Sequence, residues 1–234
     1  MESMSTRKRE HSQHIETKGS LRLYEQLVIL LRTRSEIKFL CNRVSLSLRA
    51  CIVIELALCG AIGLKEGRVV GKDNTLNNSL LLEAMSKIYQ VQLPPDELMY
   101  RLNGEKRGGS VHMKNVRLRV YKDLEERRIC RVENKNLIFN KITMSDYNIR
   151  IELINYIKEY LTCSKEIDYR AEALVVCLTF CSAIDSILIC MTEKEAAASS
   201  AHISRIKEKY MVKRTYGSRR ETIIYSVLNA LLSS

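Results

Sequence analysis

Residues 48–60 read Leu48-Arg49-Ala50-Cys51-Ile52-Val53-Ile54-Glu55-Leu56-Ala57-Leu58-Cys59-Gly60. Apolar residues fill every turn of this run, and a helix that is apolar all round belongs in the centre of a fold. The two charges, Arg49 and Glu55, argue against a membrane span, because charged groups are costly in lipid. The same holds for Ala171–Met191, which contains Glu172 and Asp185. Both stretches are therefore predicted to be buried core helices.

The composition favours a mainly helical globular chain. Of its 234 residues 46% are hydrophobic, while only 2 are proline and 9 are glycine. We expect a disordered basic tail over residues 1–19, followed by one compact helical domain over residues 20–234, with buried central helices and one or more β-hairpins on its surface.

Outward from the central helix, apolar spacing and turn residues predict the remaining elements. Further helices are expected over 21–31, 80–91, 95–102, 111–128, 146–161, 193–210 and 219–232, with Ser20 as a cap of the first helix. One hairpin is expected within 62–75, and a second from strands at 129–132 and 136–139.

The eight cysteines lie mostly inside apolar runs, and no CxxC pair occurs. No apolar signal segment opens the chain. We therefore expect reduced thiols in a cytosolic protein. His11 and His14 have no cysteine partners at zinc spacing, so no metal is predicted.

The formal charge of +11 favours polyanionic partners: nucleic acid, an anionic membrane or acidic protein segments. Lys114 and Arg117 are three residues apart and would share one face of the expected helix over 111–128. Together with Arg49 they could hold one phosphate group. The alternatives are that Arg49 pairs with an acidic side chain such as Glu55, and that the other two cations belong to a solvated surface.

Several segments together resemble the Golgi phosphoprotein 3 family, which consists of peripheral Golgi proteins that bind phosphatidylinositol 4-phosphate and retain glycosyltransferases. The resemblance is most specific in Leu48–Gly60 and Met113–Arg119. It is less specific in Leu21–Leu31, Leu80–Met85 and Ala173–Ser186.

The resemblance implies a headgroup site formed by a tryptophan, an arginine on the buried helix and two cations on the later helix. Arg49, Lys114 and Arg117 match the three cations, whereas Leu40 stands at the position of the tryptophan. Leucine keeps apolar character but lacks the indole N–H that favours the membrane interface. Lipid binding is therefore expected to be weaker or less selective.

The resemblance also implies partners: cytosolic tails of glycosyltransferases, the COPI coat, and self-association. The basic triplet Arg7, Lys8 and Arg9 would contact the coat, although such a tail can bind any polyanion. In the second hairpin, Leu137, Ile138 and Phe139 would contact the membrane or another copy, or the hairpin simply covers the core. The expected location is the cytoplasmic face of the Golgi membrane, and also the cytosol.

The sequence contains no GxSxG, GxxxxGK[ST], HExxH or GxGxxG pattern, so neither an enzyme nor a cofactor is predicted. The competing interpretation is a nucleic-acid-binding protein, because a helix followed by a basic hairpin resembles a winged helix. A helical scaffold without a ligand is a third. Binding to nucleic acid should fall steeply with salt, whereas a headgroup site should discriminate between phosphoinositides at fixed salt.

Overall fold

The chain is mainly helical, as predicted. The computed structural model describes residues 21–31, 42–72, 75–105, 111–134, 140–145, 147–163, 166–212 and 219–234. The helices are α2 (Leu23–Leu30), α3 (Asn42–Leu58), α4 (Ser79–Val91), α5 (Pro95–Asn103), α6 (Val116–Glu126), α7 (Tyr147–Cys163), α8 (Tyr169–Phe180), α9 (Asp185–Leu188), α10 (Glu193–Met211) and α11 (Arg219–Leu232). The strands are β1 (Ile62–Lys65), β2 (Arg68–Gly71), β3 (Cys130–Asn134) and β4 (Asn140–Met144).

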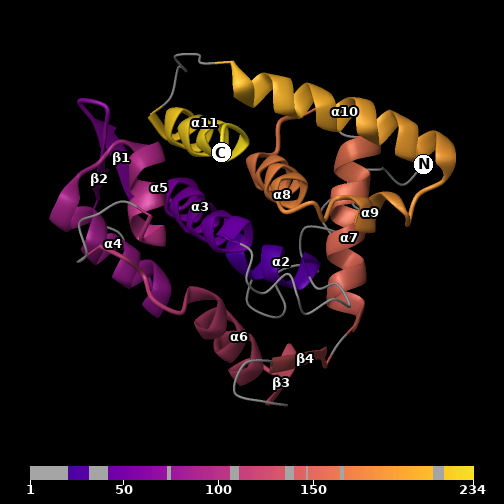
Figure 1. Ribbon diagram of the computed structural model, residues 1–234, viewed down its shortest axis with the longest axis horizontal. Helices are drawn as coiled ribbons and strands as arrows, with labels where there is room; N and C mark the ends of the chain where they lie inside the picture. Colours follow the sequence, from indigo (N-terminus) through magenta and orange to yellow (C-terminus); the bar gives the residue numbers. More distant parts are fainter. Residues whose placement is uncertain are drawn as a thin grey trace, which may run out of the picture.

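Helix α3 runs through the middle of the molecule (Figure 1), and every side chain from Leu46 to Ala57 is buried. Helices α2, α5, α8 and α11 contact it directly. This confirms that the apolar run forms a buried central helix. In the described part of the chain, no helix combines the length and the apolarity that crossing a membrane requires.

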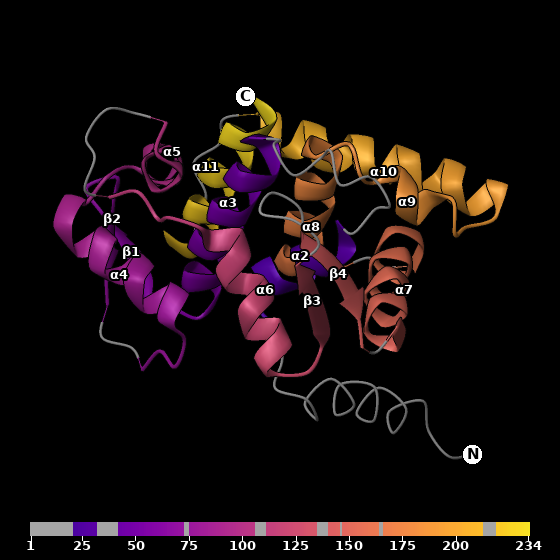
Figure 2. The ribbon, with the colours of Figure 1, turned by 60° about the horizontal axis from the view of Figure 1, so that its bottom comes forward.

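Two antiparallel hairpins lie at the edges of the helical body. Strands β1 and β2 pair with Ile62 opposite Gly71, next to α4. Strands β3 and β4 pair with Cys130 opposite Met144 and lie beside α6, which Figure 2 brings to the front. The predicted second strand of this hairpin was placed too early, because β4 begins at Asn140. Leu137, Ile138 and Phe139 lie outside the described residues.

Two predicted helices have different bounds. The helix expected over 111–128 begins only at Val116, for a reason given with the site below. The helix expected over 171–191 stops at Phe180, where Ser182 adopts a positive φ of 54°. Ser182 N–H then donates to Thr179 O and Ala183 N–H to Leu178 O, which closes the helix end. Glycine usually marks such an end, so a serine there gave no signal in the sequence.

Glu55 fixes two helices against α3. Its carboxylate, 5% exposed, accepts a hydrogen bond from the Leu23 backbone N–H at 2.7 Å. It also accepts two from the guanidinium of Arg170, at 2.6 and 3.0 Å. The first turn of α2 and the first turn of α8 therefore meet at one buried acid. The alternative that Glu55 pairs with Arg49 is wrong.

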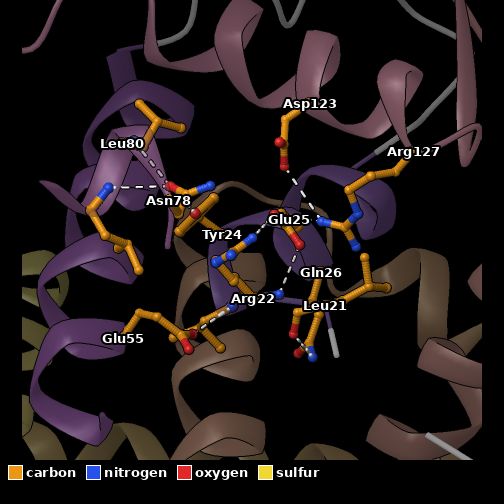
Figure 3. A network of polar contacts seen from close by, with 12 residues as sticks. Leu21, Arg22, Tyr24, Glu25, Gln26, Glu55, Asn78, Leu80, Asp123 and Arg127 are labelled. Atoms are coloured by element: carbon orange, nitrogen blue, oxygen red, sulfur yellow. Dashed lines mark hydrogen bonds and ion pairs between the residues drawn. The ribbon is translucent and has the colours of Figure 1, made fainter. Parts of the chain in front are cut away.

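Two further buried acids connect helices in the same way. Glu25 on α2 is fully buried and binds both Arg22 and Arg127, each at 3.0 Å (Figure 3). Glu172 on α8 accepts two bonds of 2.8 Å from Lys209 on α10 and one of 3.0 Å from Tyr160 on α7. These paired acids hold α6, α7 and α10 against the inner helices.

The seven described cysteines carry free thiols, and four of them are buried, in agreement with the prediction of reduced cysteines. Cys41 lies outside the described residues, as does the predicted cap Ser20.

Glu55→Gln should lower the free energy of unfolding by about 3 kcal/mol, the low end for breaking a buried pair, because Arg170 is one-third exposed. Urea denaturation followed by circular dichroism measures the loss. Glu97→Gln is the control, since Glu97 forms a surface pair with Arg101 within one helix and should cost about 0.5 kcal/mol or less. Equal effects of both variants would contradict the central role of Glu55.

Candidate anion-binding site

Arg49 joins the central helix to the turn that precedes α6. It lies on α3 and is only 4% exposed. Its Nη1 donates to Ser45 O at 3.1 Å and to Ser45 Oγ at 2.8 Å, one turn earlier on the same helix. Its Nη2 donates to Met113 O at 2.7 Å. These acceptors are uncharged, and no carboxylate of a described residue is hydrogen-bonded to this buried guanidinium.

Arg49 also has a guanidinium nitrogen outside these contacts. Among the described residues, its buried Nε has no hydrogen-bond partner. Burial lowers the pKa of Arg49 to about 10, while the nearby carboxylate of Glu83 acts in the opposite direction. The side chain therefore remains a cation at neutral pH.

The contact with Arg49 also explains why α6 starts late. Met113 N–H donates to Leu102 O at 3.0 Å, and Met113 O accepts from Arg49. Both backbone groups of Met113 are thus bonded to α5 and α3, and neither joins the hydrogen-bond pattern of α6. Asn115 follows with a positive φ of 53°, and the helix begins at Val116. Lys114 consequently lies in a turn, and the prediction that it shares a helix face with Arg117 is wrong.

In addition to burial, the positive charges of Arg49 and Lys114 both lower the pKa of His112. Lys114 is exposed and has no ion pair with any other described residue. The half-buried imidazole of His112 has a pKa below its ordinary value, first because of burial and then because of the positive charges of Arg49 and Lys114. The structure thus brings these two predicted cations together around His112.

Arg117 lies on the first turn of α6, and its guanidinium carbon is 5.7 Å from the ring centroid of Tyr121. This contact follows the helix itself and does not lead to Arg49. Leu40 and the tail residues Arg7, Lys8 and Arg9 lie outside the described residues.

A chain of polar contacts connects the start of α3 with the end of α5 beside the site. The sequence analysis did not predict these contacts. Ser45 Oγ donates to Asn103 Oδ1 at 2.6 Å, and Asn103 Nδ2 donates to Asn42 Oδ1 at 3.0 Å. Both asparagines also donate to Glu105, at 2.5 and 3.0 Å. The start of α3 is therefore tied to the end of α5. The spacing of Asn42, Ser45 and Arg49 along one helix face was the signal that could have revealed it.

The acidic groups close to the site, Glu83 and Glu105, have other partners. Glu83 on α4 forms an ion pair with Arg119 on α6. Glu105 is bonded by the two asparagines. In the part of the chain that the structure describes, histidine, cysteine and acidic side chains form no cluster able to hold a metal ion.

Comparison with family models shows to which protein family the chain belongs. The model described as Golgi phosphoprotein 3 (GPP34) matches residues 23–216 of the chain. The chain belongs to the Golgi phosphoprotein 3 family. The match covers most of the described helices, including α3 and the turn before α6, and membership supports a Golgi phosphoprotein 3-like role at the Golgi. No curated protein matches the chain significantly.

Arg49→Met should lower the free energy of unfolding by about 1–3 kcal/mol, because the buried carbonyl of Met113 loses its charged donor while the apolar stem is kept. Backbone amides around residues 113–116 should exchange hydrogen faster. Urea denaturation and hydrogen exchange measure both effects. Arg119→Met, which removes a partly exposed arginine from α6, serves as control, and equal exchange in the two variants would show that Arg49 does not hold the turn.

Proposed function

We propose that this member of the Golgi phosphoprotein 3 family is a peripheral adaptor, not an enzyme, that binds phosphatidylinositol 4-phosphate through Arg49, Lys114 and Arg117. It would act on the cytoplasmic face of the Golgi membrane and exchange with the cytosol. The domain over residues 20–234 would hold cytosolic tails of glycosyltransferases. The tail over residues 1–19 would contact the COPI coat through Arg7, Lys8 and Arg9 and so retain these enzymes in COPI vesicles.

The observation that carries the proposal is the absence of a carboxylate hydrogen-bonded to Arg49 or Lys114, as far as the described residues extend. Elsewhere in the molecule, charged residues as deeply buried as Arg49 are paired: Glu25, Glu55 and Glu172 each bind an arginine or a lysine. A buried cation without such a partner destabilises the folded state unless a bound anion pairs with it. A phosphate monoester offers charge and several acceptor oxygens, which suits a guanidinium with a spare N–H.

One headgroup site rarely holds a protein on a membrane, because stable anchoring usually needs a second signal. The net charge of +11 supplies an attraction to anionic lipid. Leu40 and the apolar hairpin residues Leu137, Ile138 and Phe139 would add insertion, and the hairpin could also join two copies. These contributions depend on salt and membrane composition, whereas recognition of the headgroup depends on the position of its phosphate.

Lys114→Ala should weaken binding to vesicles containing phosphatidylinositol 4-phosphate by roughly tenfold, the value of one charge-assisted hydrogen bond. Vesicle flotation at physiological salt compares this lipid with phosphatidylinositol 3-phosphate and 5-phosphate. Lys194→Ala is the matched control, because Lys194 is an exposed lysine on α10, far from α6 in Figure 1. Arg49→Ala combined with Lys114→Ala and Arg117→Ala should abolish selective flotation while the protein stays folded.

Equal binding of all anionic vesicles, unaffected by these substitutions, would overturn the headgroup site. If the wild type then bound duplex DNA with a steep dependence on salt, the nucleic-acid interpretation would take its place.

Leu40→Trp should strengthen vesicle binding, because an indole at the membrane interface combines an apolar ring with a hydrogen-bond donor. Flotation at several lipid concentrations gives the shift in partition. Leu40→Ala is the matched control and should weaken binding. Unchanged binding of both variants would mean that this position does not face the bilayer.

A further inference from the structure

His112 occupies the turn between the two predicted cations. It directly precedes Met113, whose carbonyl is bonded to Arg49, and lies two residues before Lys114. Its ring packs against the backbone of Gly104 at the end of α5. A Cβ at Gly104 would come within 3.1 Å of the imidazole Cγ and Cδ2 atoms and 3.3 Å of Nε2. Gly104 also has a positive φ of 84°, so glycine leaves the space that the ring occupies.

No described residue forms a hydrogen bond with His112, and the side chain is half-buried. The groups near this turn that can donate to an anion are the guanidinium of Arg49, the ammonium of Lys114 and the imidazole of His112. Sequence reasoning missed this histidine, because it belongs to no motif and to no helix.

Charged groups face His112 from three directions. Arg49 comes from α3, Lys114 from the same turn and Glu83 from α4. The two cations disfavour a third positive charge, whereas Glu83 favours it but is shared with Arg119. Glu105, next to Gly104, is held by Asn42 and Asn103. Burial and the two cations thus lower the pKa of His112, which favours the neutral imidazole when no ligand is bound.

We propose that His112 is a third, proton-linked ligand of the phosphate monoester bound at Arg49 and Lys114, so that binding strengthens as the pH falls. The inference rests on the proposed function and concerns the regulation of the same site. When the anion arrives, the imidazole takes up one proton from solvent, and the imidazolium then donates to a phosphate oxygen.

The direction in which affinity changes with pH follows from the linkage between proton binding and anion binding. A phosphate monoester carries about −1.5 to −2 charges at neutral pH and offsets the repulsion from the two cations, so the pKa of His112 is higher in the complex than in the free protein. A group whose pKa rises on binding strengthens binding as the pH falls from the bound toward the free pKa. One proton gives at most about a tenfold gain per pH unit.

The phosphate also titrates, with a second pKa of about 6, and its loss of charge weakens binding at low pH. Wild type must therefore be compared with a variant at each pH, so that titration of the ligand cancels. His112→Gln suits this comparison, because glutamine keeps an N–H donor and does not ionise. His202→Gln is the control histidine variant, since His202 lies on α10 with its Nδ1 3.0 Å from Leu161 O.

The experiment measures binding between pH 5.5 and 7.5 of phosphatidylinositol 4-phosphate vesicles, of glycerophosphoinositol 4-phosphate and of inorganic phosphate. The ratio of wild-type to His112→Gln affinity should rise severalfold as the pH falls. The His202→Gln protein should follow the wild type. Calorimetry of glycerophosphoinositol 4-phosphate in two buffers of different ionisation enthalpy should show more proton uptake by the wild type than by His112→Gln.

Each outcome decides between the proposals. A ratio that stays constant with pH, while both proteins bind the lipid selectively, would overturn the role of His112 and leave the headgroup site standing. No binding of any of the three probes by the wild type would overturn both. Equal affinity for inorganic phosphate and for the headgroup, with proton uptake in both, would keep the role of His112 but identify free phosphate as the ligand.

Discussion

The arrangement of helices depends on the pairing of Glu55 inside the core. Helix α3 is apolar all round, so an acid on it is tolerated only with charged and hydrogen-bonding partners. Arg170 supplies the charge, and the Leu23 N–H at the first turn of α2 is a donor that no helical carbonyl could satisfy. One carboxylate therefore specifies how two helices, separated along the chain by more than a hundred residues, approach the central one.

The same rule distinguishes the candidate site from the rest of the core. Glu25 and Glu172 repeat the pattern of Glu55, each with a cationic partner on another helix. Arg49 is as deeply buried but donates to uncharged acceptors, and its Nε is unpaired among the described residues. Arg49 therefore differs from the buried acids because it has no charged hydrogen-bond partner among the described residues, and this makes it a functional candidate.

The spacing of apolar residues predicted most of the helices, because residues that commonly begin or end helices lie at their ends. Helix α3 ends two residues before Gly60, whose φ of 73° suits glycine, and α11 matches its predicted bounds. The failures occurred where distant contacts outweigh local spacing. Arg49 donates a hydrogen bond to the carbonyl of Met113, 64 residues later in the chain. Helical spacing alone therefore could not reveal that α6 starts late. The resemblance made Arg49 and Lys114 candidates from the sequence, whereas the positions of His112 and Ser45 beside them became visible only in the folded chain.

Arg49 holds the turn in place and is also a candidate ligand of the anion. The effect of replacing it therefore has to be distinguished from the effect of replacing Lys114 or His112. Its two Nη groups hold the turn through Met113 O and hold α3 through Ser45, so removing them disturbs the position of Lys114 as well. Its Nε takes no part in these contacts and is buried, without a hydrogen-bond partner among the described residues. Lys114 and His112 lie on the turn that Arg49 positions, with side chains that no hydrogen bond or ion pair from a described residue holds in place. Loss of binding through these two residues therefore reports on the ligand, whereas loss through Arg49 combines ligand and fold.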